Sequence, residues 1–380
     1  MVRLYPNRVC RIADDGGFGI NYSERLNKLR ERIRAAEIDV LLVSEPHNIF
    51  YLSGCAGGMT GARVRLIVDS QKSTLIIDHR YYDEALKSAN ADEIAPWAKP
   101  SMEEIVAVAR QNGAKRAGFE ATHVTVRQFE RLVEEFGEVQ LVGLSNLVEP
   151  LREVKDEYEI ANIAAAAALA DRAFDHIIDF IKPGTSERDI AIELDYFMLR
   201  NGARKPSFET IVASGANSAI PHAVPSEKRI EPGDFVKLDF GAVIEGYHSD
   251  MTRTVVVGEA SSRKREIYEK VREAQLAALA AVAPDKSGEE IDAAGRRIIA
   301  EAGLGEYFTH NVGHGVGLNV HESPVLGAGS KSLLKPQMVV TVEPGIYISG
   351  FGGVRIEDLV VVTETGNKIL THSTKELLEL

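Results

Sequence analysis

Hydrophobic and polar residues alternate along this chain with two different periods, and each change of period marks an expected element. Over residues 22–39, leucine, isoleucine and alanine recur on one face of a helix, behind Ser23 as a candidate N-cap. Helices are also expected from Tyr81 and over 125–137. Short apolar runs predict buried strands at 40–43, 65–69, 73–78 and 116–120. This alternation predicts an α/β domain over residues 1–150, of which the first twenty residues are expected to form an irregular lead-in.

The second half of the chain, residues 151–380, opens on an alanine-rich helix expected over 156–180. Two later segments resemble each other at a constant offset of 101 residues: Pro183 and Pro284, Ser186 and Ser287, Ile190 and Ile291, Gly202 and Gly303. Each segment has a proline turn, a serine N-cap, an amphipathic helix and a closing glycine. Two capped helices can resemble each other by chance, but the matching order of the flanking elements favours a duplication. We therefore expect two helix–helix–strand halves with a site at their seam.

Composition narrows the class of protein. The chain has 380 residues, 44% hydrophobic and 26% charged, as in ordinary globular enzymes of one or two domains. The net charge of −12 does not attract phosphate, so no nucleic-acid partner is expected, and solubility is the simpler interpretation of this charge. Two cysteines without a CxxC pair argue against a disulfide framework or a thiolate metal site. Since no apolar run reaches membrane-spanning length, we expect a cytoplasmic protein without a membrane partner.

Five residues that can bind metal ions stand in apolar or glycine-marked contexts, which point their side chains inward. They are Asp239 in VKLDFGA, Asp250 in GYHSDMTRT, His314 in HNVGHGVG, Glu343 in VVTVEPGIY and Glu357 in GGVRIEDLVVV. Four carboxylates and one imidazole in a core are costly as bare charges. Two divalent cations would neutralise them, and oxygen-rich ligation with one histidine suits Mn²⁺ or Co²⁺. The sequence therefore predicts a two-metal hydrolase.

Strand alternation predicts how these side chains meet. Asp239 shares a strand face with Lys237, and after a turn at Gly246, Asp250 shares a face of the return strand with Thr252. Such a hairpin places two carboxylates side by side, and both stay ionised only if cations hold them. Two further pairs share strand faces, Thr341 with Glu343 and Arg355 with Glu357. Each residue alone has a simpler interpretation, such as a turn glutamate or a structural histidine, so the combination carries the argument.

The order D…D…H…E…E, in LDFGAVIEGYHSDMTRT, HNVGHGVGLNVHESP, VEPGIY and GGVRIED, resembles the pita-bread metallopeptidases. The chain is most similar to their proline-specific branch, the Xaa-Pro aminopeptidases and Xaa-Pro dipeptidases (prolidases). The resemblance covers residues 155–380, and more loosely 20–150, where PHNIFYLSG is similar to their N-terminal domain. Methionine aminopeptidases usually lack that domain, and creatinase-like relatives lack the full ligand set. The implied fold class is α+β: a pita-bread catalytic domain with duplicated halves, preceded by a smaller α/β domain, in an expected homodimer.

The resemblance implies a role for each metal ligand. Asp239 would bind one ion, His314 and Glu343 the other, and Asp250 and Glu357 would bridge both. Two such ions clamp a shared water molecule and lower its pKa, and Glu343 is placed to take its proton.

Four further residues match site positions of the family. His222 in IPHAVPS and His321 in NVHESP match the histidines that donate to the scissile carbonyl and the oxyanion. His310 matches another histidine that lines the site, and Arg355 would orient neighbouring carboxylates. Without the resemblance, a loop histidine is the simpler interpretation of His222 and of His310.

One position departs from the family pattern. Many prolidases carry an arginine four residues after the histidine of the HExP segment, where it clamps the carboxylate of a dipeptide, and here Val325 stands there. The predicted function is therefore a dinuclear-metal Xaa-Pro aminopeptidase-like activity on short peptides with proline second, with Mn²⁺ expected and Co²⁺ or Zn²⁺ as alternatives. An Xaa-Pro dipeptidase remains the alternative, because another arginine could replace the clamp. A related small-amide hydrolase and a non-catalytic peptide-binding module are further alternatives, and the intact ligand set counts against the module.

Overall fold

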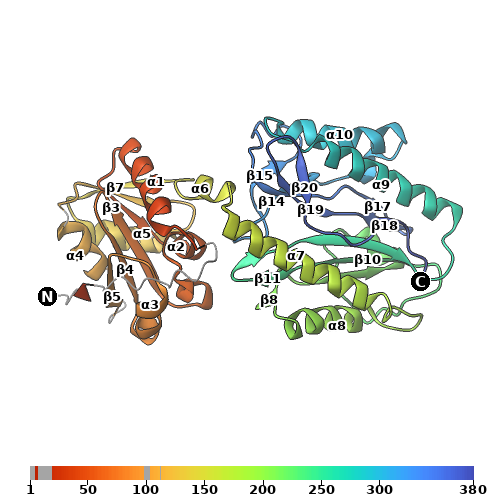
Figure 1. Ribbon diagram of the computed structural model, residues 1–380, viewed down its shortest axis with the longest axis horizontal. Helices are drawn as coiled ribbons and strands as arrows, with labels where there is room; N and C mark the ends of the chain where they lie inside the picture. The colour runs from red at the N-terminus through yellow and green to blue at the C-terminus, as the bar shows by residue number, and fades with distance from the viewer. Residues whose placement is uncertain (1–4, 7–18, 98–102, 112) are drawn as a thin grey trace. The chain divides into compact units, whose positions relative to one another are not determined.

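The computed structural model describes residues 5–6, 19–97, 103–111 and 113–380, so most of the expected lead-in lies outside the described residues. The chain divides into two compact units, Met1–Arg152 and Glu153–Leu380. In Figure 1 the first is coloured red to yellow and the second yellow-green to blue. None of the helices in the described part of the chain combines the length and hydropathy that a membrane span requires.

The N-terminal unit is built on a seven-stranded mixed sheet with the order β1-β5-β4-β3-β2-β6-β7. Its strands are β1 Tyr5–Pro6, β2 Val40–Val43, β3 Val64–Asp69, β4 Ser73–Asp78, β5 Glu93–Trp97, β6 Arg116–Glu120 and β7 Gln140–Leu144. Its helices are α1 Tyr22–Ala35, α2 Pro46–Ser53, α3 Tyr82–Ser88, α4 Glu103–Gln111 and α5 Val126–Phe136, and α6 Glu149–Glu153 spans the boundary. The four strands predicted from apolar runs are present, and the α/β class of this unit is confirmed.

One local prediction in this unit is wrong. Helix α1 begins at Tyr22, and its N-cap is Asn21, whose side chain accepts a hydrogen bond from the backbone N–H of Glu24. Ser23 therefore lies inside the first turn. Asparagine and serine are about equally good caps, so the sequence pattern could not choose between neighbouring positions.

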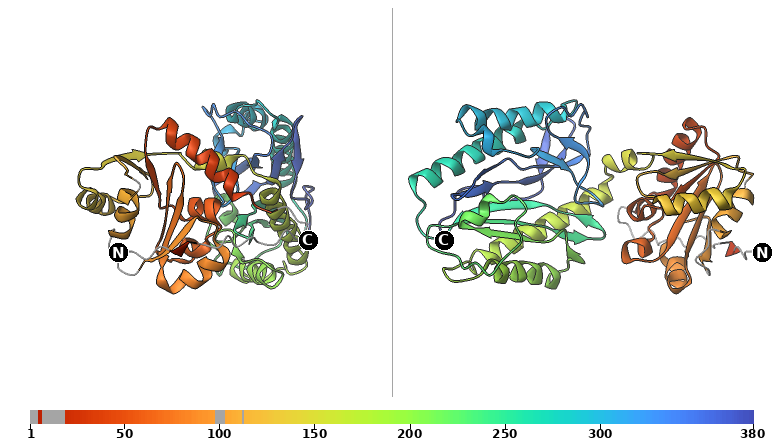
Figure 2. Two further views of the ribbon diagram at one scale, coloured as in Figure 1. Left: turned by 60° about the vertical axis from the view of Figure 1, so that its left-hand side comes forward. Right: turned by 180° about the vertical axis from the view of Figure 1, so that it is seen from behind.

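The C-terminal unit places its strands between two helical layers, with α7 and α8 on one side and α9 and α10 on the other (Figures 1 and 2). These helices are α7 Glu157–Ile177, α8 Glu187–Arg200, α9 Ser262–Ala281 and α10 Gly288–Glu301. The strands of the first half are β8 Lys205–Pro206, β9 Ile211–Ser214, β10 Phe235–Phe240, β11 Ala242–Ile244, β12 Tyr247–His248 and β13 Met251–Val256. Those of the second half are β14 Gly313–Gly315, β15 Glu322–Leu326, β16 Val339–Val342, β17 Gly345–Ile348, β18 Gly352–Arg355, β19 Asp358–Val362 and β20 Asn367–Ile369.

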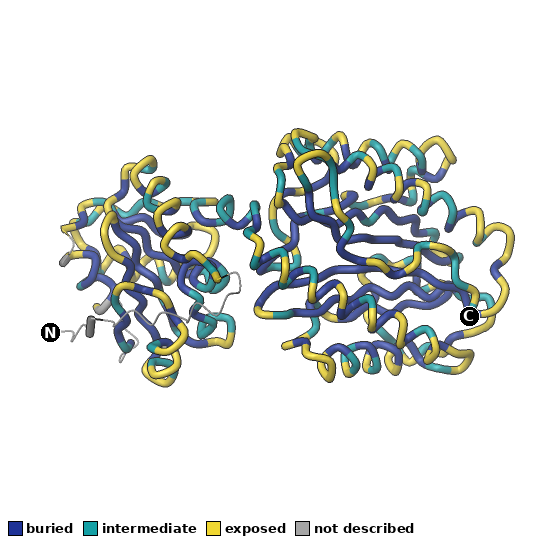
Figure 3. Tube along the Cα trace, viewed as in Figure 1, coloured by how far each residue is buried: buried dark blue, intermediate teal, exposed yellow. Residues whose placement is uncertain are grey.

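Each half has its own apolar core, and the central strands β10, β13, β16 and β19 are buried along their length (Figure 3). In the first half, Ala166, Ala170 and Ala173 on one face of α7 are fully buried, which lets the helix approach the sheet closely. Strand β10 turns Val236, Leu238 and Phe240 toward this core. Because side chains alternate along a strand, Lys237 and Asp239 point to the opposite face.

The predicted duplication appears in the geometry of the two halves. Ser186 caps α8 and Ser287 caps α10 through the same side-chain-to-backbone hydrogen bond. Each serine also forms an isolated bridge to a later segment, Ser186 to Arg229 and Ser287 to Leu333. The sheets repeat as well: β10 pairs with β9 and β13, and β16 pairs with β14 and β19, all antiparallel. The α+β class with two helix–helix–strand halves is confirmed.

Candidate metal centre

The first half contributes two carboxylates from adjacent strands. Asp239 lies on β10 directly opposite Thr252 of β13, and Asp250 immediately precedes β13. The connection between these strands turns at Glu245 and Gly246, which both have positive φ. The hairpin predicted from the sequence is therefore present, with a short inner pair, β11 and β12, at its tip.

The second half contributes His314, Glu343 and Glu357. His314 lies on β14, where the register with β15 shifts directly after it. Glu343 follows the last residue of β16, and Glu357 lies between β18 and β19. The expectation that Arg355 and Glu357 share one strand face is wrong, because the chain leaves β18 at Arg355 and starts a new strand at Asp358. Both side chains nevertheless line the same cavity.

One cavity of about 730 Å³ is lined by all nine residues predicted for the site, Asp239, Asp250, His314, Glu343, Glu357, His222, His310, His321 and Arg355. Val325 lines it as well. The structure therefore brings together side chains that are spread over 136 positions of the sequence, from His222 to Glu357. Their individual roles stay predictions.

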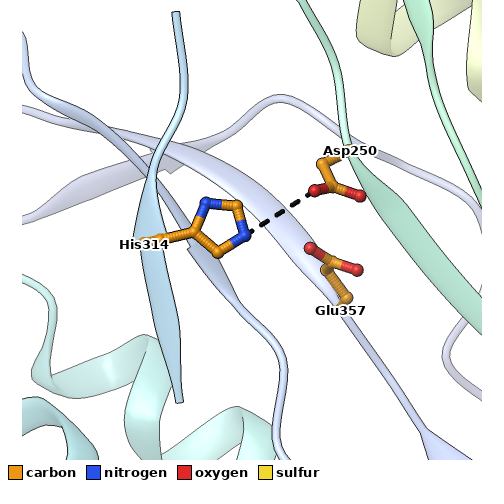
Figure 4. Close-up of side chains that lie close together, drawn as sticks. All are labelled: Asp250, His314 and Glu357. Carbon is orange, nitrogen blue, oxygen red and sulfur yellow. Dashed lines mark ion pairs between the residues drawn. The ribbon is translucent and has the colours of Figure 1, made fainter. Parts of the chain in front are cut away.

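The ligand atoms approach one another closely. Asp250, His314 and Glu357 each offer one atom within 4.8 Å of the other two, and Figure 4 shows their side chains converging from three separate segments. His314 Nε2 lies 3.2 Å from Glu343 Oε1 and 3.7 Å from Asp250 Oδ2. Thr252 donates its hydroxyl to Glu357 Oε2 at 2.7 Å, which fixes one oxygen and leaves the other free to bind.

Two of these carboxyl groups, those of Asp250 and Glu357, ionise less readily than ordinary carboxyl groups when no metal is bound. Burial, and then the neighbouring Glu357, Asp239 and Glu343, hold the pKa of Asp250 well above its ordinary value. Burial and the charges of Glu343 and Asp239 raise the pKa of Glu357 in the same way. Repulsion among carboxylates in a desolvated pocket is the physical cause, and a bound cation would remove it.

Glu343 and His314 behave as a pair. Burial alone would raise the pKa of Glu343, but its hydrogen bond to His314 and the charges of His314 and Arg355 lower it to about 2. The same contact raises the pKa of His314 against the effect of burial. Metal ligation requires a neutral imidazole, so it would displace the proton that His314 shares with Glu343.

Arg355 connects the ligands to Tyr347, a residue that the sequence pattern did not indicate. Its guanidinium donates to Asp239 Oδ2, to the Thr252 hydroxyl at 2.9 Å and to the Tyr347 hydroxyl at 2.7 Å. Tyr347 also contacts His310 Nε2 at 3.0 Å, and burial raises the pKa of its phenol to about 12. Tyr347 lies two residues after Gly345 in the VEPGIY segment, and its place in that strand is the only signal that could have indicated it.

The residues present fit divalent cations. The four carboxylates outnumber the guanidinium of Arg355 by three, which is costly in a buried site unless cations compensate. Asp239 Oδ1 and Glu357 Oε1 are buried and have no hydrogen-bond partner among the described residues. Buried carboxylate oxygens are normally satisfied, so these two point to ligands that bind them. Asp239, Asp250, His314, Glu343 and Glu357 would hold the ions.

Comparison with known families agrees with this donor set. Residues 161–364 match the family described as Metallopeptidase family M24, which is more than half of the chain. The chain belongs to metallopeptidase family M24. Residues 25–154 match the Creatinase/Prolidase N-terminal domain, so the N-terminal and the C-terminal unit both match known protein families. As a member of this family, the chain is a hydrolase that depends on divalent metal ions.

Relatives cover nearly the whole chain. It is 40% identical over 358 residues to a Xaa-Pro dipeptidase of Pyrococcus furiosus, covering 93% of this chain and 99% of the relative. The solved structure of a Xaa-Pro dipeptidase from Bacillus anthracis is 43% identical, covers 95% of this chain and 100% of its own, and superposes with a TM-score of 0.91. An X-Pro aminopeptidase from Thermotoga maritima, 35% identical, covers 93% and 99% with a TM-score of 0.86. The prediction of the proline-specific pita-bread family is confirmed.

Proposed function

We propose that this protein hydrolyses the peptide bond before a proline, with dipeptides of the type Xaa-Pro as its substrates. The observation that carries the proposal is the cavity in which four carboxylates, His314, His222 and His321 converge. Two divalent ions, with Mn²⁺ the ion expected from the oxygen-rich donor set, would be held there. When bound, such ions polarise a carbonyl group and lower the pKa of a water molecule.

The protein's own groups account for the proton transfers and for the developing charge. Glu343 would accept a proton from the attacking water, and then deliver it to the leaving imino nitrogen of proline. His321, whose ring centre lies 4.2 Å from that of His314, would donate to the oxyanion that forms at the scissile carbonyl. Burial and the nearby His314 lower the pKa of His321, so the neutral ring serves as a hydrogen-bond donor near neutral pH. His222, an exposed residue that lines the cavity, would donate to the substrate carbonyl.

Two lengths of substrate have separate support. The names of the relatives favour the dipeptidase alternative over the aminopeptidase-like function first predicted. Longer peptides are favoured by a specific observation: Val325 lines the cavity half-exposed, where a clamp for a dipeptide carboxylate is expected. Among the described lining residues, Arg355 alone carries a permanent positive charge, and it is bonded to Asp239. A dipeptide carboxylate would therefore have to be held by neutral donors or histidines.

Turnover of Ala-Pro against Ala-Pro-Ala, measured after metal stripping and again with added Mn²⁺, tests the proposal. We expect no activity without metal and a higher kcat/KM for Ala-Pro with it. Equal or faster cleavage of Ala-Pro-Ala would establish the aminopeptidase function instead. No cleavage of either peptide by the metal-loaded protein would refute proline specificity.

Substitution of Val325 sharpens the same test. Val325→Arg should raise the preference for Ala-Pro over Ala-Pro-Ala, because arginine binds a carboxylate through two parallel hydrogen bonds. Val224→Arg is the matched control, since Val224 also lines the cavity and is more exposed. An equal shift in both variants would mean that general charge, and not a clamp at position 325, sets the preference.

A further inference from the structure

A lysine is buried beneath the metal centre, two residues before Asp239. Lys237 lies in the middle of β10, paired with Ala213 of β9 on one side and Thr254 of β13 on the other. The residue has no exposed surface. Lysine is almost never fully buried without partners, so its contacts need a physical reason.

The partners of Lys237 are backbone carbonyls of a segment that lines the cavity. Its Nζ donates to the carbonyl of Ile220 at 2.7 Å and to that of Pro221 at 3.0 Å, and it lies 5.0 Å from the centre of the Tyr347 ring. Arg355 also reaches the Pro221 carbonyl, at 3.5 Å. Separating a buried donor from its acceptors leaves unsatisfied polar groups in a desolvated site, so these hydrogen bonds hold the two peptide units firmly.

His222 directly follows these two anchored peptide units. Its side chain is exposed at the cavity, as is that of Val224, while Ala223 between them is buried against β9. Pro221 and Pro225 lack backbone N–H groups and cannot donate to a sheet. The buried side chain of Lys237 therefore connects the carbonyls of this segment directly to the strand that carries Asp239.

The other half of the unit has a counterpart at the same position. Thr341 precedes Glu343 by two residues, as Lys237 precedes Asp239, and it is also fully buried. Its hydroxyl accepts from the backbone N–H of His314 at 3.0 Å and donates to Glu343 at 3.1 Å. In each half, a buried polar residue two positions before the carboxylate fixes the backbone next to a histidine of the cavity.

We propose that Lys237 is a positioning residue, which sets the place of His222 by holding the carbonyls of Ile220 and Pro221. The proposal rests on the function proposed above for His222, and its effect on rate would pass through that histidine. A misplacement of about 1 Å can cost about 10²-fold in rate, even when the changed residue is remote from the chemistry.

A double-mutant cycle tests the path of this effect. Lys237→Met keeps the length of the side chain and removes its donors, and it should lower kcat/KM for the Xaa-Pro peptide by about 10–100-fold. In the His222→Ala background the same change should cost less than about threefold, because the positioned ring is gone. In the His321→Ala background, the matched comparison, it should cost the full amount. Equal losses in both backgrounds would overturn the proposal.

Amide hydrogen exchange gives a readout that needs no substrate. In Lys237→Met, peptides covering 215–226 should exchange faster than in the wild type, while those covering 311–322 should not change. Lys155→Met is the control for loss of a buried lysine, since Lys155 bonds to Glu322 and the carbonyl of Glu153 instead, so 215–226 should stay as in the wild type. If Lys237→Met does not fold, Lys237→Gln, whose shorter side chain cannot reach both carbonyls, replaces it. Unchanged exchange of 215–226 overturns the proposal, whatever peptides the enzyme cleaves.

Discussion

The first half of the C-terminal unit supplies Asp239 from β10 and Asp250 from the residue before β13. The second half supplies Glu343 from the end of β16 and Glu357 from the residue before β19. Each half therefore places one carboxylate at its central strand and one at the entry of the neighbouring strand. Two similar folding units that face each other gather four carboxylates without a dedicated loop for each.

The two halves differ at the position that supplies a histidine ligand in one of them. Gly315 of β14 is opposite Val340 of β16, and Ser214 of β9 is opposite Val236 of β10, so the residues before them occupy corresponding positions. These residues are His314 in the second half and Ala213 in the first. The repeated framework thus determines where the carboxylates lie, whereas a substitution in one half makes the two sides of the metal centre chemically different.

The first residues of α8 and α10 occupy corresponding positions in the two halves, but they contact their surroundings in different ways. The first residue of α8 is Glu187, whose buried carboxylate accepts from Ser214, Asn217 and Ser226. The first residue of α10 is Gly288, where a Cβ atom would lie 2.2 Å from the carbonyl oxygen of Val325. The first half fixes its neighbouring loop by hydrogen bonds, and the second half by close approach of the backbone.

The largest expected effect comes from removing one carboxylate of either half. Asp250→Ala and Glu357→Ala should each abolish turnover, because each side chain is proposed to serve both ions. Steady-state kinetics with added Mn²⁺ measures the loss, and Asp179→Ala, at an exposed helix-end position, is the control. Normal turnover by either site variant would break the two-metal interpretation and the equivalence of the halves.

His321→Ala should reduce kcat by about 10²–10³-fold, the usual effect of losing one donor to an oxyanion. KM should change less, because the donor acts on charge that develops only in the transition state. Steady-state kinetics over a range of Ala-Pro concentrations separates the two constants. An unchanged kcat would mean that His321 has a structural role. His222 of the first half would then be the remaining histidine proposed as a donor to the substrate.

Thr341→Val should weaken Mn²⁺ binding by about 10–100-fold, the typical cost of losing a hydrogen bond to a metal ligand. The change removes the hydroxyl that contacts both His314 and Glu343. Titration of the metal-stripped protein with Mn²⁺ measures the affinity. Thr363→Val, which removes a turn hydrogen bond to Gly366, should leave it unchanged. Equal affinity in both variants would show that Thr341 does not set the geometry of His314.

The smallest expected effect is a release of protons on metal uptake. The pKa values of Asp250 and Glu357 are raised by burial and by neighbouring carboxylates, so both retain protons where a free carboxyl group is ionised. Ligation requires the ionised form, so the apparent affinity for Mn²⁺ should rise with pH until the pH exceeds these raised values.

Calorimetry in buffers of different ionisation enthalpy counts the protons released. Glu357→Gln should release fewer than the wild type, because its amide cannot be protonated at these pH values. An affinity that does not depend on pH would show that the carboxyl groups of both halves are already ionised before metal binds.

Several elements of the fold were predictable because their signals are local. Ser186 and Ser287 cap their helices as the sequence pattern predicts, and the hairpin that carries Asp239 and Asp250 follows from strand alternation and the turn at Gly246. The cap of α1 was misplaced because Asn21 and Ser23 are both suitable and only the backbone conformation distinguishes them. Short-range patterns therefore locate an element more reliably than its first residue.

The sequence by itself determined the two-unit α+β architecture, the duplicated halves and the family, because helix caps, strand periods and flanked ligand residues are encoded within short segments. Only the tertiary structure decided which side chains meet. Glu357, which lies between β18 and β19, lines the cavity, and Tyr347 joins Arg355 to His310. Lys237 finds its partners sixteen and seventeen residues away, at Pro221 and Ile220. Such contacts depend on the packing of segments that are distant in sequence, where no local period or spacing specifies the partner.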